Sequence, residues 1–206
     1  MNFTEDQIDA LTEVVNIGVG RAASSLHTML DRHIELHVPQ VRVCSVSEMR
    51  ESLVANNQPL DTSVVQDFDG AIAGRAMLAF PNASGVTLAK LLSDEDLDDD
   101  ELEYDLAGIL EELGNIVLNG VLGSIANVFS DDFHYSVPEI FNGAAADALA
   151  CEEKNGIACE GEQTCLLADA RFDVADSKIS GSLLLAFNTD ELGVLLDNLL
   201  KSVSAA

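Results

Sequence analysis

The chain has 206 residues, of which 48% are apolar and 22% charged, a composition typical of proteins that fold around a hydrophobic core. Asp and Glu number 36 against 10 Lys and Arg, so the formal net charge is −26, and no stretch rich in Lys or Arg offsets it. Phosphate backbones and anionic lipid would repel such a surface. The charge therefore excludes nucleic acids and membrane surfaces as partners.

The N-terminus and the cysteines indicate the compartment. Residues 1–6 are acidic where a secretory signal would be basic, and no run approaches the roughly 18 apolar residues that span a membrane. The number of cysteines is even, but a chain of this size does not need disulfides in order to fold. We expect a soluble cytoplasmic protein with reduced thiols at Cys44, Cys151, Cys159 and Cys165.

The first half of the chain is predicted to run helix, strands, helix. Apolar side chains recur at helical spacing, without a proline, over residues 5–30. Residues 34–46 alternate and are rich in β-branched side chains, which indicates a strand, with Pro39 at a bulge or an edge. The remaining elements of this half are expected to be a short helix at 47–54, a turn-rich stretch at 56–61, a hairpin over 62–80 that turns at Asp69-Gly70, and a helix at 82–93.

The second half repeats this order. Residues 70–92 read GAIAGRAMLAFPNASGVTLAKLL and residues 178–200 read KISGSLLLAFNTDELGVLLDNLL, so that Gly74 matches Gly181 and Phe80 matches Phe187. The second half is expected to contain a helix at 101–127, strands near 132–141, 165–173 and 178–187, and a helix at 189–201. Residues 144–164 have no counterpart and are predicted to form an inserted helix and loop.

The repeat predicts the fold class. Two similar units, at about 1–95 and 101–206, would form one domain over residues 1–206. Helices that alternate with hairpins favour an α+β fold, in which helices cover an antiparallel sheet. Two half-units with exposed edges would join most simply into one continuous sheet with pseudo-twofold symmetry. The long helices 5–30 and 101–127 should then lie side by side.

Polar side chains form a stripe on each long helix. Asp9, Glu13 and Asn16 are spaced i, i+4 and i+7, which places them on one face, opposite an apolar stripe. The second helix repeats the pattern with Glu112, Asn115 and Asn119. A single Glu or Asn on such a face is usually no more than solvated surface. However, both halves keep Glu-x2-Asn, trailing glycines and a proline 23 residues after the Asn, at Pro39 and Pro138.

The trailing glycines indicate a close approach. Gly18 and Gly20 follow Asn16, and Gly120 and Gly123 follow Asn115 and Asn119. Each glycine in a helix interior costs about 1 kcal/mol relative to alanine. Either a neighbouring helix or a partner protein is therefore expected to come close to these positions.

The motif Asp9-x3-Glu13-x2-Asn16-x22-Pro39 resembles the Asp/Ser-x3-Glu-x2-Asn-x22-Pro signature of the CheC phosphatases of bacterial chemotaxis. This family, with CheX and the flagellar-switch protein FliY, dephosphorylates the response regulator CheY. The resemblance covers nearly the whole chain. Two motifs in one chain match CheC better than CheX, which has one, whereas a FliY is expected to continue into a C-terminal flagellar-switch domain.

The resemblance implies a mechanism and a division of roles. The substrate is an aspartyl phosphate on another protein, which brings its own Mg²⁺, so that no cofactor or metal of the chain itself is expected. Hydrolysis needs a water placed in line with phosphorus, and a neutral carboxamide can hold that water without repelling the phosphoryl anion. Asn16 and Asn115 are therefore the expected catalytic groups. Glu13 and Glu112 are each implied to form a salt bridge with the regulator's active-site lysine, and Asp9 is an accessory at the first site.

The second motif departs from the signature at one position. Gly108 stands where the family has Asp or Ser, which removes one polar contact and is expected to loosen the helix by about 1 kcal/mol. Glu112, Asn115 and Pro138 remain. On this basis Asn115→Ala is expected to cost less activity than Asn16→Ala.

Two further patterns are interpreted as structural. Asp94, Asp96, Asp98 and Asp100 resemble an EF-hand loop, but Asp99 stands where that loop needs Gly and Asp105 where it needs Glu, so an acidic linker is favoured over a calcium site. The spacing of Cys151, Cys159 and Cys165 lacks the short Cys-x2-4-Cys pair of structural zinc sites.

One alternative to catalysis stays open. The same stripes would serve a non-catalytic module that binds and sequesters the phosphorylated regulator. A CheD-like deamidase is a further partner that the family resemblance suggests.

Overall fold

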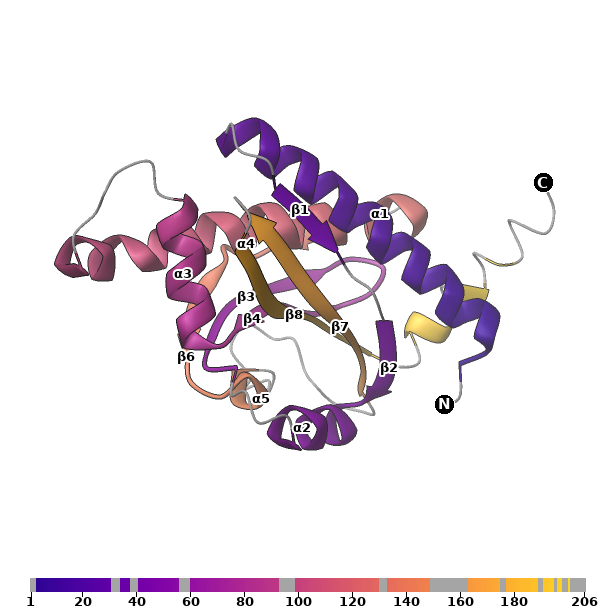
Figure 1. Cartoon of the computed structure of the whole chain (residues 1–206). Coiled ribbons are helices and arrows are strands. Elements are labelled where there is room, and N and C mark those ends of the chain that lie inside the picture. Colours follow the sequence, from indigo (N-terminus) through magenta and orange to yellow (C-terminus); the bar gives the residue numbers. More distant parts are fainter. Residues whose placement is uncertain are drawn as a thin grey trace.

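One antiparallel sheet forms the centre of the protein, with helices on both faces (Figure 1). The computed structural model describes residues 3–30, 34–37, 41–55, 60–92, 99–129, 133–148, 163–174, 177–188, 191–194, 196, 197 and 200. The helices are α1 (Glu5–Leu30), α2 (Val46–Ala55), α3 (Asn82–Leu92), α4 (Asp99–Phe129) and α5 (Ala145–Ala148). The strands are β1 (Ile34–His37), β2 (Val41–Ser45), β3 (Thr62–Asp69), β4 (Gly74–Phe80), β5 (His134–Tyr135), β6 (Glu139–Asn142), β7 (Gln163–Val174) and β8 (Ser177–Asn188).

The elements follow the predicted order, and the α+β fold with a continuous antiparallel sheet is confirmed. The predicted strand at 34–46 is instead two strands, β1 and β2, which end and begin on either side of Pro39. Proline has no N–H to donate to a ladder, so it favours such a break. The insertion contains the short helix α5, and residues 149–162 lie outside the described residues. The described residues within the predicted helix 189–201 are helical.

The two halves of the chain exchange strands in the sheet. The strand order is β1-β7-β8-β4-β3-β5, with β2 paired to β7 and β6 paired to β3. The hairpin β3–β4 of the first half therefore receives β5 and β6 from the second half, and the hairpin β7–β8 receives β1 and β2 from the first. The expected joining of two half-units edge to edge is too simple, because each side of the sheet is built from both halves.

The repeated glycines lie where the two hairpins meet. Strand β4 pairs with β8, and Gly74 lies opposite Phe187. A side chain on Gly74 would collide with the carbonyl oxygen of Ala186, and a Cβ on Gly181 would lie 2.8 Å from the ring of Phe80. Glycine at 181 thus leaves room for the ring of Phe80 from the other hairpin, and glycine at 74 leaves room for the backbone of β8 and for the ring of Phe68 in its own hairpin.

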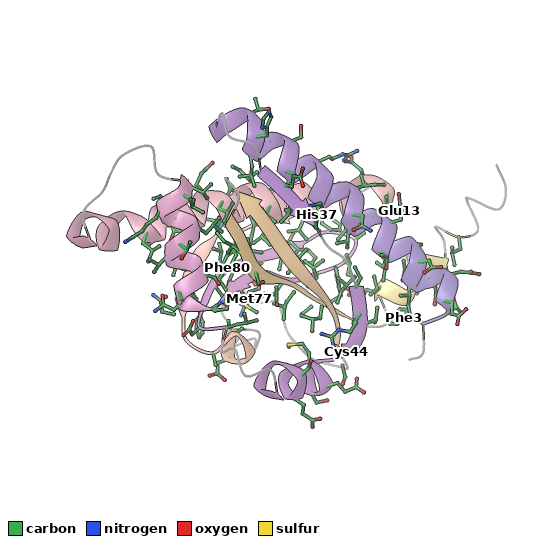
Figure 2. The ribbon with its side chains drawn as sticks, in the orientation of Figure 1. Phe3, Glu13, His37, Cys44, Met77 and Phe80 are labelled. Carbon is green, nitrogen blue, oxygen red and sulfur yellow. The ribbon has the colours of Figure 1, made fainter. Side chains whose placement is uncertain are left out.

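The two faces of the sheet carry separate cores. Helices α1, α3 and α4 cover one face and enclose the larger apolar cluster, which includes Leu11, Val64 and Phe187. Helices α2 and α5 cover the other face, where Met49 and Met77 belong to a smaller cluster. Figure 2 labels one residue of each cluster, Phe80 of the larger and Met77 of the smaller.

Helices α1 and α4 lie side by side, as predicted (Figure 1). A Cβ on Gly18 would lie 2.6 Å from the Cα of Val121, and a Cβ on Gly120 would lie 3.0 Å from the Cβ of Ala22. Arg21 Nη1 donates a hydrogen bond of 3.2 Å to Ser124 Oγ across the crossing. A neighbouring helix is therefore the reason for Gly18 and Gly120.

Helix α4 contains a long apolar stretch. Its segment Leu106–Val128 is long and apolar enough to cross a membrane by length and composition alone, although polar side chains such as Glu112 and Asn115 interrupt it. More than half of that stretch is buried inside the protein. Its apolar character is thus what a helix needs when it lies between α1 and a sheet.

Candidate functional site

The first motif forms an exposed stripe on α1. Asp9, Glu13 and Asn16 are all exposed, while Leu11 and Val15 on the opposite side are buried. Figure 2 labels Glu13 on this helix. The predicted outward orientation of the motif is confirmed, and its carboxylates and carboxamide are accessible to a second protein.

The start of α1 is held by a capping box. Thr4 N donates to Gln7 Oε1 at 2.8 Å, and Gln7 N donates to Thr4 Oγ1 at 3.3 Å. Gln7 Nε2 also donates to Asp197 Oδ1 at 2.8 Å. The N-terminal turn is thereby tied to the C-terminal part of the chain, one turn before the motif begins.

The second motif lies on α4 and is partly enclosed. Gly108 and Glu112 are exposed, whereas Asn115 and Asn119 are half-buried. A Cβ on Gly108 would meet nothing within 4 Å, so this glycine is not needed for a close approach. Gly114 differs, because a side chain there would collide with Val64 of β3. Glycine at 114 therefore lets α4 lie close to that strand beside Asn115.

A chain of carboxamides connects Asn115 to the sheet. Asn119 Nδ2 donates to Asn115 Oδ1 at 2.7 Å, and Gln66 Nε2 donates to Asn119 Oδ1 at 3.1 Å. Gln66 Nε2 also donates to the backbone oxygen of Ser136 at 3.0 Å. Gln66, on β3, is only 1% exposed. Asn119 was expected in the stripe, whereas Gln66 was not predicted; its signal in the sequence is a polar residue between Val64 and Phe68 on the inward face of a strand.

The proline of the second motif lies close in sequence to Ser136, whose backbone oxygen accepts the hydrogen bond from Gln66. Pro138 belongs to the break between β5 and β6, both of which pair with β3. Ser136 N donates to the backbone oxygen of Asp67 at 2.9 Å, and Asp67 N donates to Ser136 Oγ at 3.0 Å. The spacing of 23 residues thus returns the chain to the strand that faces Asn115. Pro39 lies outside the described residues, between β1 and β2.

The surface around the motifs has open space and one apolar side chain. A Cβ on Gly20 or on Gly123 would meet nothing within 4 Å, in contrast to Gly18 and Gly120. Ile17, next to Asn16, is 43% exposed. Of the two explanations for the trailing glycines, a neighbouring helix accounts for Gly18 and Gly120. Gly20 and Gly123 leave the helix surface without side chains, so that a partner protein could approach the backbone there.

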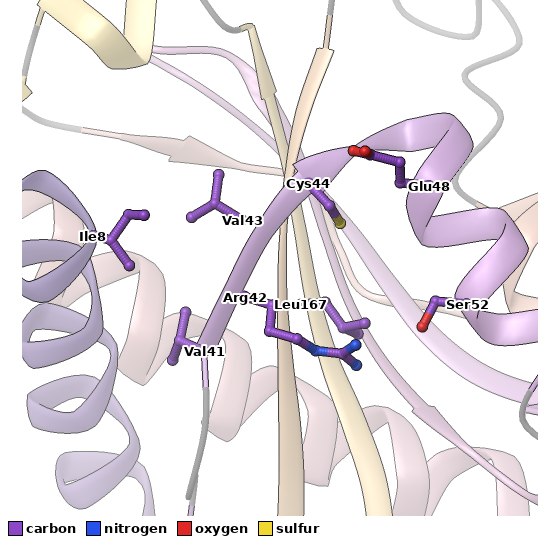
Figure 3. Close-up of a pocket in the computed structure, with 8 residues that line it drawn as sticks. All are labelled: Ile8, Val41, Arg42, Val43, Cys44, Glu48, Ser52 and Leu167. Carbon is purple, nitrogen blue, oxygen red and sulfur yellow. The ribbon is translucent and has the colours of Figure 1, made fainter. Parts of the chain in front are cut away.

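A separate cavity of about 360 Å³ lies between α1, β2 and α2 (Figure 3). Its lining is mainly apolar, and it contains none of the motif residues. Burial raises the pKa of the Cys44 thiol, and the nearby carboxylate of Glu48 raises it further, against a smaller opposite effect of Arg42. A thiol in this state is a poor nucleophile.

The acidic run and the cysteine cluster fall largely outside the described residues. Residues 93–98 and 149–162, with Asp94, Cys151 and Cys159, are not described, so the predictions of no calcium site and no zinc site stay predictions there. Among the residues that the structure describes, no group of three or more His, Cys, Asp or Glu side chains could hold a metal ion. Cys165 lies opposite Cys44 in the register of β2 and β7.

Comparison with known proteins places the two motifs in a family. The CheC-like family matches residues 7–42, and the family of the chemotaxis phosphatase CheX matches residues 62–161. The CheY-P phosphatase CheC of Bacillus subtilis is 30% identical over 139 residues, which are 66% of each chain. The chain belongs to the CheC-like family. Its motifs Glu13-x2-Asn16 and Glu112-x2-Asn115 lie within the residues matched by the two families.

Solved structures share the fold at low sequence identity. FliY of Thermotoga maritima superposes with a TM-score of 0.68 at 16% identity, covering 98% of this chain and 99% of that one. The FliM middle domain of a Vibrio species gives 0.59 at 14% identity, covering 92% and 99%. CheX of Borrelia burgdorferi, in a complex with CheY, BeF3 and Mg²⁺, gives 0.50 at 17% identity, covering 83% and 96%. These likenesses establish the fold of this CheC-like protein and leave its activity to the residues of the site.

Proposed function

We propose that this CheC-like protein is a phosphatase that hydrolyses the aspartyl phosphate of a CheY-like response regulator. The observation that carries the proposal is the pair of Glu-x2-Asn motifs, which place accessible carboxylates and carboxamides on two adjacent helices. The name of the relative in B. subtilis, CheY-P phosphatase, and the CheX–CheY complex support this substrate class.

The proposed roles follow from the charges. A carboxylate beside a phosphoryl anion would repel it, so Glu13 and Glu112 do not contact the phosphoryl group. The family resemblance implies that each forms a salt bridge with a lysine of the regulator, with Asp9 as an accessory at the first site. Asn16 and Asn115 are neutral and hold a water in line with the phosphorus atom. The water oxygen bonds to phosphorus as the bond to the aspartyl oxygen breaks, which leaves the free carboxylate and inorganic phosphate.

The metal for this reaction would belong to the regulator. The resemblance to the family implies that the regulator brings this ion, and Mg²⁺ usually keeps several waters and takes only one or two carboxylates from a protein. The proposal is therefore that the chain acts on a substrate that already holds its Mg²⁺. A CheD-like deamidase is retained as a second proposed partner, on the family resemblance alone.

Turnover distinguishes this proposal from sequestration. The FliM middle domain shares the fold, so the fold alone does not imply catalysis, and the module that only binds the regulator stays the competing function. Substoichiometric protein should accelerate phosphate release from each phosphorylated CheY-like regulator of the source organism in turn, with many turnovers per molecule for the true substrate. A protein that only sequesters would protect its own molar amount, and phosphate release would not rise with time beyond the control.

A further inference from the structure

We propose that Gln66 and Asn119 are positioning residues for the second site, which lock the carboxamide of Asn115 in one orientation. This inference rests on the proposed function and deepens it. The three carboxamides form a continuous hydrogen-bonded chain, here called the amide relay, from Ser136 through Gln66 and Asn119 to Asn115.

The direction of the amide relay is set at its buried end. The backbone oxygen of Ser136 can only accept, so the atom of Gln66 that lies 3.0 Å from it must be the nitrogen Nε2. The same nitrogen bonds to Asn119, which must therefore present its oxygen to Gln66. Asn119 then has its nitrogen left for Asn115, and Asn115 presents Oδ1. A carbonyl of the main chain thus decides which way round the catalytic carboxamide stands.

This orientation suits the proposed chemistry. With Oδ1 engaged by Asn119, the Nδ2 group of Asn115 and the second lone pair of Oδ1 are left for the water and the phosphoryl group. An exposed carboxamide rotates between two orientations, only one of which presents these groups correctly. If the orientation is fixed before the regulator binds, the entropy cost of ordering the carboxamide is not paid during the reaction.

Stability alone does not account for Gln66. The residue is buried among apolar side chains, and its Oε1 has no hydrogen-bond partner among the described residues. Burying an amide with an unsatisfied acceptor costs free energy, and an apolar side chain of similar volume would avoid that cost. A glutamine at this position is explained by what its Nε2 holds in place.

At the first site, the positions equivalent to those of the amide relay hold no carboxamide besides Asn16. The hairpin registers place Gln66 opposite Ala76 on β4 and Ala168 opposite Leu183 on β8, so Ala168 is the counterpart of Gln66 in the repeat. Gly20 stands four residues after Asn16, as Asn119 stands four residues after Asn115. Alanine and glycine have no polar side chain, and therefore these two positions cannot orient Asn16 as Gln66 and Asn119 orient Asn115.

The test isolates the second site with Asn16→Ala, so that turnover of the phosphorylated regulator reports on Asn115. In this background Gln66→Met keeps the volume and removes the donor, and Asn119→Ala removes the next link. Each should lower kcat about tenfold with KM for the regulator unchanged, because docking through Glu112 is intact. Combining the two should lower kcat no further, since both cut the same relay.

Two controls exclude a general effect on the fold. Ser63→Ala removes another buried polar group of β3, one that has no hydrogen-bond partner among the described residues, and should leave kcat of the second site unchanged. Placing Gln66→Met in an Asn115→Ala background reports on the first site, where kcat should not change. Equal losses at both sites, or no loss at the second, would overturn the inference.

A spectroscopic readout separates this inference from the proposed function. In the wild-type protein the side-chain amide of Asn115 should give one ordered pair of NMR resonances, which Gln66→Met should shift toward the averaged values of a freely rotating amide. If the wild type shows no turnover, the proposed function fails and the resonances alone decide on the relay. If the wild type turns over but the Asn16→Ala protein does not, the second site is inactive, and the relay has no role in catalysis.

Discussion

The two motifs of this CheC-like protein are copies in sequence but differ in their surroundings. On α1 the stripe is fully exposed and complete, with Asp9, Glu13 and Asn16. On α4 the accessory carboxylate is replaced by Gly108, while Asn115 is half-buried and held by the amide relay. The first site thus has more groups for docking, and the second has a better ordered group for chemistry.

The difference suggests that the two sites contribute differently to binding of the regulator and to hydrolysis. Val15 of α1 is fully buried, and its counterpart on α4 is Gly114, whose missing side chain lets that helix approach Val64 of β3. The approach places Asn119 within reach of Gln66. We therefore expect the first site to bind the regulator with the lower KM and the second to hydrolyse faster once occupied.

The largest effect is expected from removing both carboxamides. The Asn16→Ala/Asn115→Ala protein should be folded and nearly inactive, with less than a few per cent of the wild-type rate of phosphate release. Asn16 is exposed, and exposed substitutions usually change stability by less than about 0.5 kcal/mol. Loss of the hydrogen bond to Asn115 should cost about 1 kcal/mol at most.

The single variants sharpen the comparison of the two sites. Asn16→Ala should cost more at low regulator concentration, where the better docking of the first site dominates. Asn115→Ala should cost more at saturation, where the relay favours the second. This adds a condition to the expectation from sequence that Asn115→Ala is always the milder change. A double variant that keeps most of the activity would show that the carboxamides are not the catalytic groups.

Charge reversal at the docking carboxylates should give the next largest effect. Glu13→Lys in the Asn115→Ala background should raise KM about tenfold or more and leave kcat within twofold, because a positive charge would then face the regulator's lysine. Glu112→Lys in the Asn16→Ala background should do the same at the second site. Initial rates over a range of phosphorylated regulator concentrations separate the two constants. A fall in kcat without a change in KM would assign these carboxylates to the chemistry.

The crossing of α1 and α4 is the component that the two sites share. Gly18→Ala should destabilise the protein by about 1–3 kcal/mol, because its Cβ would lie 2.6 Å from the Cα of Val121, where only a shift of backbone can relieve the contact. Gly20→Ala on the same helix meets nothing within 4 Å and should stabilise by up to about 1 kcal/mol through helix propensity. Denaturant unfolding measures both. Equal effects of the two substitutions would show that α1 is not held by close packing on α4.

The elements that local pattern determines could be predicted from the sequence. The bounds of α1 are as predicted, because its apolar spacing and the Thr4–Gln7 cap both act within the helix. The β3–β4 hairpin was likewise predicted, although its connection is residues 70–73 and is longer than a two-residue turn at Asp69-Gly70. Outward orientation of Glu13 and Asn16 followed from the same helical period.

The rest depends on contacts between residues far apart in the chain. Exchange of β1 and β2 into the second hairpin leaves no local signal, since either hairpin edge could have accepted them. The amide relay joins Gln66 of the first half to Asn119 of the second, and only the folded sheet brings them together. Gly18 and Gly20 look alike in sequence, yet one contacts α4 and the other meets open space.

The smallest effect is expected from restoring the missing carboxylate at the second site. Gly108 is exposed, and a Cβ there meets nothing within 4 Å, so Gly108→Asp needs no rearrangement and replaces a poor helix former. In the Asn16→Ala background the added charge should lower KM for the phosphorylated regulator about twofold to threefold and leave kcat unchanged. The gain should disappear at 0.5–1 M salt, because exposed charges are then screened within about 3–5 Å.

Gly108→Asn is the matched control, since it adds a side chain of the same shape without charge and should leave KM where it was. If both substitutions lower KM equally, helix stabilisation and not charge is the cause. If Gly108→Asp instead raises kcat, then the accessory carboxylate acts on the carboxamide, and the division between a docking site and a hydrolysing site would have to be abandoned.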